Sequence, residues 1–304
     1  MKVFYAASNG LPLPQGHRFP VQKYTSLVET VIQSGLFDTH HLQPVEPATF
    51  EQISLVHDQD YIQRVFDGQL SEKELRRIGF PWSPELVDRS RRSVSATIHA
   101  CQAALQDGLA VNLGGGTHHA YPDHGEGYCV FNDVATAARA TLAAGMANRI
   151  IILDCDVHQG NGTAAIFIND PAVYTFSIHG ERNFPFHKEH SDLDIALPDM
   201  ADDRTYLDAL EPGLMQALEQ SRADLGIYIA GADPFVGDRL GRMALSKQGL
   251  LTRDNLVLDR CQTFGLPLAI VMGGGYAPNV QDIVDIHFNT IQAALRKEKN
   301  ETVS

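Results

Sequence analysis

The segment from residue 154 to 158 reads Asp-Cys-Asp-Val-His and brings two carboxylates and one imidazole close together. In extended backbone, alternate side chains share a face, so Asp154, Asp156 and His158 would lie together. These groups repel and desolvate one another unless a cation lies among them. Capping of the next helix, or pairing with basic residues, is the alternative. Three polar groups at the end of one apolar run favour a metal site instead.

Oxygen and nitrogen donors suit zinc or another divalent first-row metal. A catalytic site commonly has three protein ligands and leaves one coordination position open for water or substrate. Asp233, which follows a later apolar run, is the natural third ligand beside Asp156 and His158.

Two adjacent histidines, His118 and His119, stand shortly after three consecutive glycines at 114–116. A lone histidine on an apolar face is usually structural, but a pair behind three glycines indicates chemistry. Glycines permit close approach of the backbone, and a near-neutral imidazole can take a proton from water and return it to a leaving amine. The three glycines lack the spacing of a phosphate-binding loop.

A second glycine triplet, at 273–275, precedes Tyr276. The triplet alone is equally consistent with a tight turn. A tyrosine hydroxyl that follows such a triplet could, however, donate a hydrogen bond to the oxyanion of a tetrahedral intermediate.

Short apolar runs alternate with helical patterns along the chain, and most of these runs are continuously apolar, as in strands buried on both faces. This alternation predicts an open, mostly parallel α/β sheet flanked by helices. The predicted strands are 3–6, 110–113, 150–154, 173–178, 226–230 and 268–272. The predicted helices are 84–107, 133–144 (capped by Asn132 or Asp133) and 206–222. No linker or repeat is evident, so residues 1–304 are expected to form one domain.

Each group of candidate residues directly follows one of the predicted strands. Ligands of open parallel sheets bind beyond the carboxyl ends of the strands, so these groups are expected to converge on one pocket. The segment 179–198 is polar, aromatic and irregular, and no element is predicted there. A stretch of that length inside a compact domain is usually functional.

The formal net charge of −13 disfavours binding to nucleic acid, and an acidic surface would suit a cationic substrate. No apolar run is long enough for a membrane span, and the N-terminal residues lack the features of a secretory signal. The four cysteines are far apart and form no CxxC pair. This disfavours a disulfide framework or a thiolate zinc site and fits a reducing, cytoplasmic setting.

Taken together, these motifs resemble the arginase/deacetylase fold and, within it, the histone deacetylase superfamily, most closely its class IV and bacterial members. The resemblance covers nearly the whole chain. It rests on Gly-His-Arg-Phe-Pro (16–20), Val-His-Asp-Gln-Asp-Tyr (56–61), Gly-Gly-Gly-Thr-His-His-Ala (114–120), Gly-Tyr-Cys-Val-Phe-Asn-Asp (127–133), Asp-Cys-Asp-Val-His-Gln-Gly-Asn-Gly (154–162), Gly-Ala-Asp-Pro (231–234), Gly-Asp-Arg-Leu-Gly (237–241) and Gly-Gly-Gly-Tyr (273–276).

The resemblance implies one zinc ion held by Asp156, His158 and Asp233. It makes His119 the general base and acid, with His118 as its electrostatic partner. It also makes Tyr276 the residue that polarises the scissile carbonyl.

Further roles follow from the same resemblance. Asp154 would orient His118. A potassium ion would bind through Asp154, Ser177, Ile178 and nearby backbone oxygens. Asn161 stands where some relatives have a carboxylate, and its neutral amide would leave His119 less basic than a carboxylate would. The implied substrate-binding residues are His17, Gly127, Tyr128, Phe184, Gly274 and Gly275.

The activity so implied is zinc-dependent hydrolysis of N-acyl amides, with deacylation of lysine side chains in proteins or peptides as the preferred reaction. Acetyl and longer acyl groups are both candidates. An acetylpolyamine or small-amide amidohydrolase is the alternative. A binuclear manganese ureohydrolase is disfavoured because residues 231–234 supply a single carboxylate, and a non-catalytic acyl-lysine binder because no expected site residue is missing. The sequence leaves the oligomeric state open.

Overall fold

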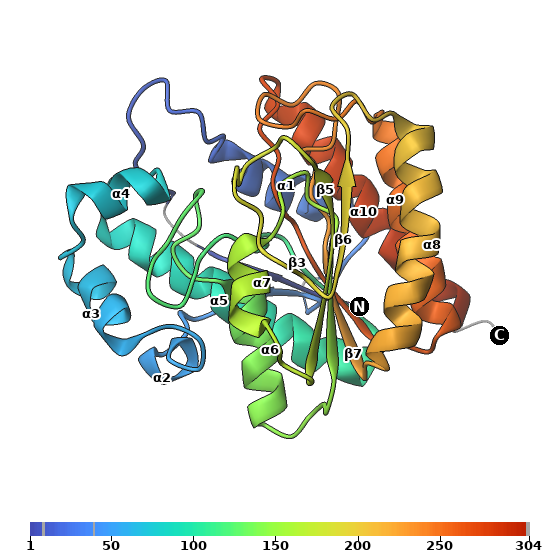
Figure 1. Cartoon of the computed structure of the whole chain (residues 1–304), viewed down its shortest axis with the longest axis horizontal. Coiled ribbons are helices and arrows are strands. Elements are labelled where there is room, and N and C mark those ends of the chain that lie inside the picture. The colour runs from blue at the N-terminus through green and yellow to red at the C-terminus, as the bar shows by residue number, and fades with distance from the viewer. Residues whose placement is uncertain (8–9, 39, 302–304) are drawn as a thin grey trace.

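A computed structural model describes residues 1–7, 10–38 and 40–301 of the chain. Its strands are β1 (Lys2–Tyr5), β2 (Leu42–Pro44), β3 (Leu109–Asn112), β4 (Ile150–Asp154), β5 (Val173–Gly180), β6 (Leu193–Leu197), β7 (Leu225–Ile229) and β8 (Leu268–Val271). They form one eight-stranded sheet in the order β2-β1-β3-β8-β7-β4-β5-β6. Neighbouring strands are parallel throughout (Figure 1).

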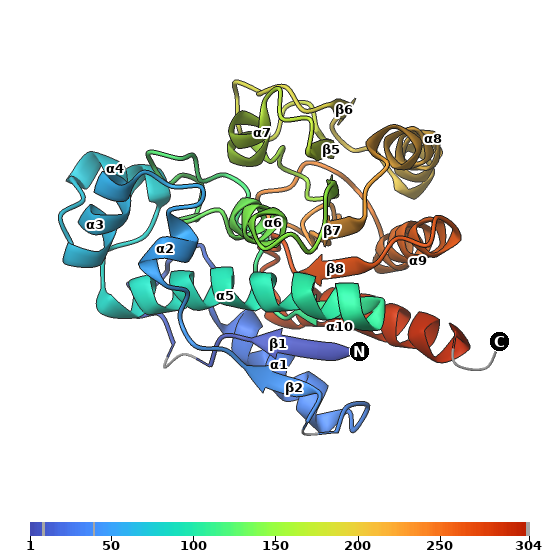
Figure 2. The same ribbon diagram turned by 90° about the horizontal axis from the view of Figure 1, so that it is seen from below.

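Helices cover both faces of this sheet. They are α1 (Gln22–Gln33), α2 (Phe50–Ile53), α3 (Gln59–Asp67), α4 (Glu72–Ile78), α5 (Pro84–Asp107), α6 (Asp133–Ala143), α7 (Asn161–Phe167), α8 (Asp203–Ser221), α9 (Lys247–Thr263) and α10 (Val280–Glu301). One apolar core joins the sheet to α5 and α6 and to the short helices α2–α4, and a second core joins it to α1, α8, α9 and α10. Figures 1 and 2 show α6 on the opposite side of the sheet from α8 and α9.

Strand β4 shows why the central strands are continuously apolar. Ile150 and Ile152 belong to the core under α5 and α6, whereas Ile151 and Leu153 belong to the core under α8 and α9. Since successive side chains of a strand point to opposite faces, a strand covered on both faces needs an apolar residue at every position.

The predicted open parallel sheet is confirmed, and all its pairings are parallel. The predicted strands recur with bounds shifted by at most two residues, and the predicted helix 84–107 matches α5. Asn132 caps α6, because its Oδ1 accepts from the amide of Ala135 at 3.0 Å. In the described ranges, no helix has both the length and the apolar composition needed to cross a membrane.

The expectation of an irregular segment over 179–198 was wrong in part, because β6 (Leu193–Leu197) lies within it. This edge strand pairs with β5, and its burial alternates along the strand because one of its faces is open. Strand β2 at the opposite edge was also missed. An edge strand has one neighbour only, so its sequence need not be apolar at every position.

Four neighbouring strands in the middle of the sheet, β3, β8, β7 and β4, carry the candidate residues at their carboxyl ends. Because all four strands are parallel, their carboxyl ends lie at the same edge of the sheet. The topology therefore brings together the segments that contain His118, His119, Tyr276, Asp233, Asp156 and His158.

Arg253 of α9 donates hydrogen bonds to the backbone just after two of these strands, β4 and β7. Its side chain is 0% exposed, and Nη1 donates to the backbone oxygens of Cys155 (3.2 Å) and Gly231 (2.6 Å). Its Nε donates to Asp254 at 2.9 Å, and Asp254 also accepts from the hydroxyl of Tyr228. The loops after β4 and β7 are thus held by one buried cation whose charge is paired.

Replacement of Arg253 by methionine should lower the free energy of unfolding by about 3–5 kcal/mol, because it leaves Asp254 buried without its cation. Urea unfolding measures this change. Arg204→Met is the matched control, since Arg204 is exposed on α8, and it should change stability by no more than about 0.5 kcal/mol. A loss below about 1 kcal/mol for Arg253→Met would contradict this role.

Candidate active site

Asp156, His158 and Asp233 form a buried cluster in which each residue offers one oxygen or nitrogen atom, and these three atoms lie within 4.8 Å of one another. The Nδ1 atom of His158 is 3.0 Å from Asp156 Oδ1 and 3.2 Å from Asp233 Oδ2. Among the described residues, Asp233 Oδ2 has no hydrogen-bond partner although it is fully buried. Two buried carboxylates, one of which has an unsatisfied oxygen, and one imidazole together fit a divalent cation with mixed oxygen and nitrogen ligands.

The electrostatics of Asp233 also call for a positive charge. Burial and the neighbouring charge of Asp156 raise the pKa of Asp233 to about 7. Glycine is required at position 274, because a Cβ atom there would lie 1.8 Å from Asp233 Oδ2. Its amide donates to Asp156 Oδ2 at 2.7 Å. The end of β8 thus approaches both carboxylates closely and stabilises the charge of Asp156.

His118 is held by Asp154 at the end of β4. Its Nδ1 donates to Asp154 Oδ2 at 2.6 Å, and Asp154 Oδ1 accepts from the amide of Asp156. Burial acts to lower the pKa of His118, but the charges of Asp154 and Asp156 outweigh it and raise the pKa to about 9. His118 therefore favours the imidazolium form and supplies a fixed positive charge beside the cluster.

His119 has the opposite electrostatic character. Its Nδ1 lies 2.6 Å from Asn161 Oδ1, an oxygen that can only accept, so Nδ1 carries the proton and Nε2 is free to accept one. Burial, together with the positive charges of His118 and His158, holds the pKa of His119 well below its usual value. Neighbouring imidazoles with pKa values pushed apart in this way suit a fixed cation and a neutral base.

Substitution of Asn161 by aspartate should raise the pKa of His119, because it places a negative charge on the hydrogen-bond acceptor of Nδ1. A higher pKa means that the neutral base is lost at higher pH. The acid limb of the kcat/KM profile should therefore move to higher pH by about 1–3 pH units. Asn161→Ala removes the acceptor and should move the limb the other way. Coincident profiles for both variants would contradict the assignment of His119 as base.

Tyr276 lies across the cluster from His119. Its ring is 6.2 Å from the ring of His158, and its amide donates to Asp238 Oδ2 at 2.6 Å. Burial and the charges of Asp233 and Asp156 raise the pKa of Tyr276 well above its usual value. The hydroxyl accordingly stays protonated and is available as a hydrogen-bond donor.

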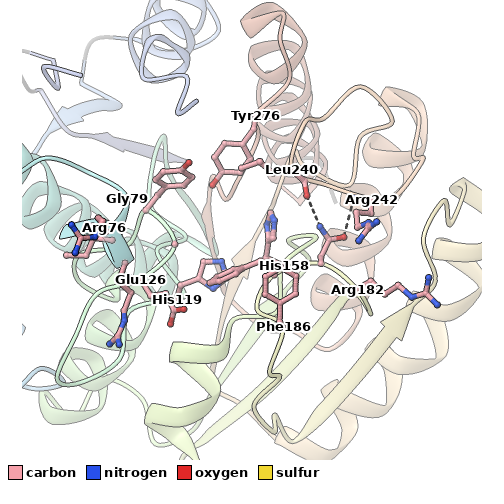
Figure 3. A pocket seen from close by; sticks show the side chains of 16 residues that line it. Arg76, Gly79, His119, Glu126, His158, Arg182, Phe186, Leu240, Arg242 and Tyr276 are labelled. Carbon is pink, nitrogen blue, oxygen red and sulfur yellow. Dashed lines mark hydrogen bonds between the residues drawn. The ribbon is translucent and has the colours of Figure 1, made fainter. Parts of the chain in front are cut away.

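A cavity of about 560 Å³ leads from the surface to these side chains. Its walls include Tyr128 and Phe184, and His119, His158 and Tyr276 also line it (Figure 3). Glycine at position 127 permits the narrow passage, because a Cβ atom there would lie 2.7 Å from the ring of His119 and 3.0 Å from that of Phe184.

The remaining predicted residues lie around this cavity. His17 lines a neighbouring hollow, where its Nε2 is 3.0 Å from the backbone oxygen of Gly79 and its Nδ1 accepts from the amide of Phe19. Gly275 packs against Ile283 of α10, away from the cavity. Ser177 and Ile178 belong to β5, and Ser177 pairs with Asp154 in the sheet register.

Sequence reasoning missed two residues that position Tyr276. Asp238 accepts from the amides of Tyr276, Leu240 and Gly241, and so fixes the loop that faces the cavity. Lys23 of α1 is buried and donates to the backbone oxygen of Gly275, with its ammonium 5.3 Å from the centre of the Tyr276 ring. Lys23 belongs to α1, so the strand-end pattern could not have indicated it. Asp238 lies in the same loop after β7 as Asp233 and within the Gly-Asp-Arg-Leu-Gly motif (237–241), so the sequence held a signal for it.

The histone deacetylase domain family matches residues 17–291 of this chain. The chain is 45% identical to an uncharacterized protein of Picosynechococcus over 94% of its own length and 95% of that protein. It is 27% identical to histone deacetylase 2 of Arabidopsis thaliana over 86% and 70% of the two chains. It is 26% identical to the acetoin utilization protein AcuC of Staphylococcus xylosus over 95% of its own length and 80% of that protein.

Solved structures share the architecture. A histone deacetylase homologue from Aquifex aeolicus superposes with a TM-score of 0.81 at 24% identity, covering 97% of this chain and 83% of that one. The HD domain of HDA15 gives the same TM-score at 20% identity, covering 97% and 88%. The structure from Aquifex aeolicus shares the arginase/deacetylase-type parallel sheet described above. The family match, over residues 17–291, covers nearly the whole chain. The chain therefore belongs to the histone deacetylase family and is a deacetylase-type hydrolase.

Proposed function

We propose that this chain is a zinc-dependent deacylase that hydrolyses the acyl amide of acyl-lysine side chains in proteins or peptides. One observation carries the proposal. His119 with its free Nε2, Tyr276 with its protonated hydroxyl, and His158 of the buried oxygen-nitrogen ligand set all line one cavity. We further propose that residues 1–304 form a single catalytic domain and that the protein acts in the cytoplasm, where its buried free cysteines would stay reduced.

The residues of the chain divide the reaction between them. The rings of Tyr128 and Phe184 would hold the lysine stem and exclude water from the channel. His119 Nε2 would accept a proton from the attacking water and later donate it to the leaving amine. The hydroxyl of Tyr276 would donate to the carbonyl oxygen as negative charge develops there, and the imidazolium of His118 would stabilise that charge. The products are a carboxylate and a free amine.

Zinc held by Asp156, His158 and Asp233 would polarise the amide carbonyl and lower the pKa of water at the site. A binuclear manganese site is disfavoured, since within the described ranges the other cluster of potential metal ligands is on the surface. We also propose a potassium ion beside Asp154, Ser177 and Ile178, whose oxygen atoms could replace its hydration shell. Activity in potassium salts compared with sodium salts would test this site.

Replacement of Tyr276 by phenylalanine should lower kcat by about 10²–10³-fold, because it removes one donor to the oxyanion. KM should change little, since the hydroxyl acts mainly in the transition state. Steady-state kinetics measure both effects. Tyr174→Phe removes a hydroxyl that donates to Gln220 on the protein surface and should leave both constants unchanged. A near-normal kcat for Tyr276→Phe would assign the oxyanion donor elsewhere.

The proposed function is tested by incubating the purified, zinc-loaded protein with one lysine peptide that carries acetyl or a longer acyl group, and with acetylpolyamines. We expect release of the free lysine peptide. Hydrolysis of acetylpolyamines in preference to every peptide would overturn the acyl-lysine assignment but retain the amidohydrolase chemistry. Absence of turnover with every acylated amine, in protein of full zinc content, would contradict the proposed function itself.

A further inference from the structure

The mouth of the cavity is basic, although the chain as a whole is acidic. Arg76, Arg77, Arg182 and Arg242 line it, against a single carboxylate, Glu126, among the described lining residues. Figure 3 shows Arg76 on one side of the opening and Arg182 and Arg242 on the opposite side, with the buried histidines between them. Since the whole chain has a formal net charge of −13, this positive charge is a local feature of the entrance.

Two of these arginines are not neutralised within the described part of the chain. Arg76 lies 3.2 Å from Glu72, and Arg242 lies 3.2 Å from Asp199. Arg77 and Arg182, by contrast, have no carboxylate within 4.0 Å among the residues that the structure describes. Arg77 belongs to α4 and Arg182 to the loop after β5. Figure 3 shows Arg76 of α4 and Arg182 on opposite sides of the mouth, so each of these two elements carries one unpaired guanidinium.

The guanidinium group matches a carboxylate geometrically, because its planar fork donates two parallel hydrogen bonds. An apolar contact lies beside these charges. Phe186 lines the same mouth and is 83% exposed. Unpaired guanidinium groups together with an exposed aromatic ring form a surface suited to an acidic polypeptide. The strongly negative net charge disfavours a nucleic acid as the partner.

We infer that the mouth selects acyl-lysine segments that carry acidic residues on both sides of the modified lysine. This inference rests on the proposed function and names its substrate class. Arg77 would face an acidic residue on one flank and Arg182 an acidic residue on the other. The same charges repel polycations, so acetylpolyamines are poor substrates. The expectation that an acidic protein suits a cationic substrate does not hold at the entrance, because the local charge there is positive.

The test uses three peptides with the same acyl-lysine, flanked on both sides by glutamate, by glutamine or by lysine. We expect kcat/KM to fall in that order, by about 3- to 10-fold from glutamate to lysine, mainly through KM. The ratio should shrink as salt is raised from about 0.05 to 0.5 M, because exposed charges are screened. Equal rates, or a preference for the lysine-flanked peptide, would overturn the inference while leaving the deacylase function intact.

Substitutions separate the mouth from the general charge of the protein. Arg77→Gln combined with Arg182→Gln should reduce the glutamate-to-lysine ratio towards one. Arg204→Gln, on the exposed surface of α8, is the matched control and should leave the ratio unchanged. A ratio unaffected by the double variant would show that these arginines do not recognise the flanks.

Binding measured by fluorescence anisotropy decides the inference even if no peptide is hydrolysed. The glutamate-flanked peptide should bind more tightly than the lysine-flanked one, and equal binding would overturn the inference independently of catalysis. Polyglutamate should displace the bound peptide. A single-stranded oligonucleotide of equal charge that competes better than polyglutamate would show that the surface recognises nucleic acid, which would also overturn the inference.

Discussion

Substitution of Asp233 by alanine should remove the bound metal and the hydrolytic activity together. The carboxylate is fully buried, and its Oδ2 lies 3.2 Å from His158 Nδ1 without a hydrogen bond of good geometry among the described residues, which suits it to the proposed metal. Loss of an outer-shell partner typically weakens metal binding about 10–100-fold, so loss of a direct ligand should exceed that range. Elemental analysis and chelator competition measure the metal, and turnover is measured on the same samples.

Asp233→Asn sharpens this test, because it keeps an acceptor for the amide of Val157, which lies 3.0 Å from Asp233 Oδ1. The asparagine variant removes the repulsion with Asp156, so its metal-free form should be at least as stable as the metal-free wild type. Asp208→Asn, on the surface of α8, is the control and should keep both metal and activity. Two tightly bound manganese ions per wild-type chain would contradict a site built for one ion.

The central sheet could be predicted because burial on both faces leaves a continuous apolar record in the sequence. The ends of the strands were less certain, because the hydrogen bonds between strands can end before the run of buried apolar residues ends. Ala230 and Met272, for instance, are buried, and their amides still donate to neighbouring backbone, yet both lie just beyond their strands. Edge strands β2 and β6 are covered less completely and leave a weaker pattern.

The convergence of candidate residues could be predicted for a topological reason. Each group follows a strand, and the parallel order β3-β8-β7-β4 brings those ends to one edge whatever the details of side-chain packing. The rim could not be predicted in this way. Arg77 belongs to α4 and Arg182 to a loop, and only the packing of α4 near that loop brings them to one opening.

Arg253 was overlooked even though the sequence held a signal for it. In α9, the residues Leu250, Val257, Leu258 and Cys261 recur at helical spacing and are buried. Arg253 and Asp254 fall on the same face, three and four residues after Leu250. Charged residues within an apolar helical face are rarely buried unless they are paired. The periodicity therefore indicated a buried ion pair beneath the sheet, which the structure contains.

Substitution of His119 by alanine should lower turnover by about 10²–10⁴-fold while the protein retains its metal. His119 contributes no atom to the cluster of Asp156, His158 and Asp233, so the ligands remain intact. In the proposed mechanism the loss arises because Nε2 accepts the proton of the attacking water and donates it to the leaving amine. Elemental analysis and steady-state kinetics on the same preparation separate these two effects.

The expected combination, full metal content with little turnover, distinguishes His119 from every ligand of the cluster. Metal loss in parallel with activity would instead assign the residue to metal binding, and near-normal turnover would assign the base elsewhere. His99→Ala is the control, because His99 is exposed on α5, and it should change neither property. Turnover by the His119→Ala variant should also lose its acid limb in the accessible pH range. The acid limb reflects protonation of the neutral His119, whose pKa is held low by burial and by the charges of His118 and His158. The alanine variant lacks this imidazole, so no such protonation can occur.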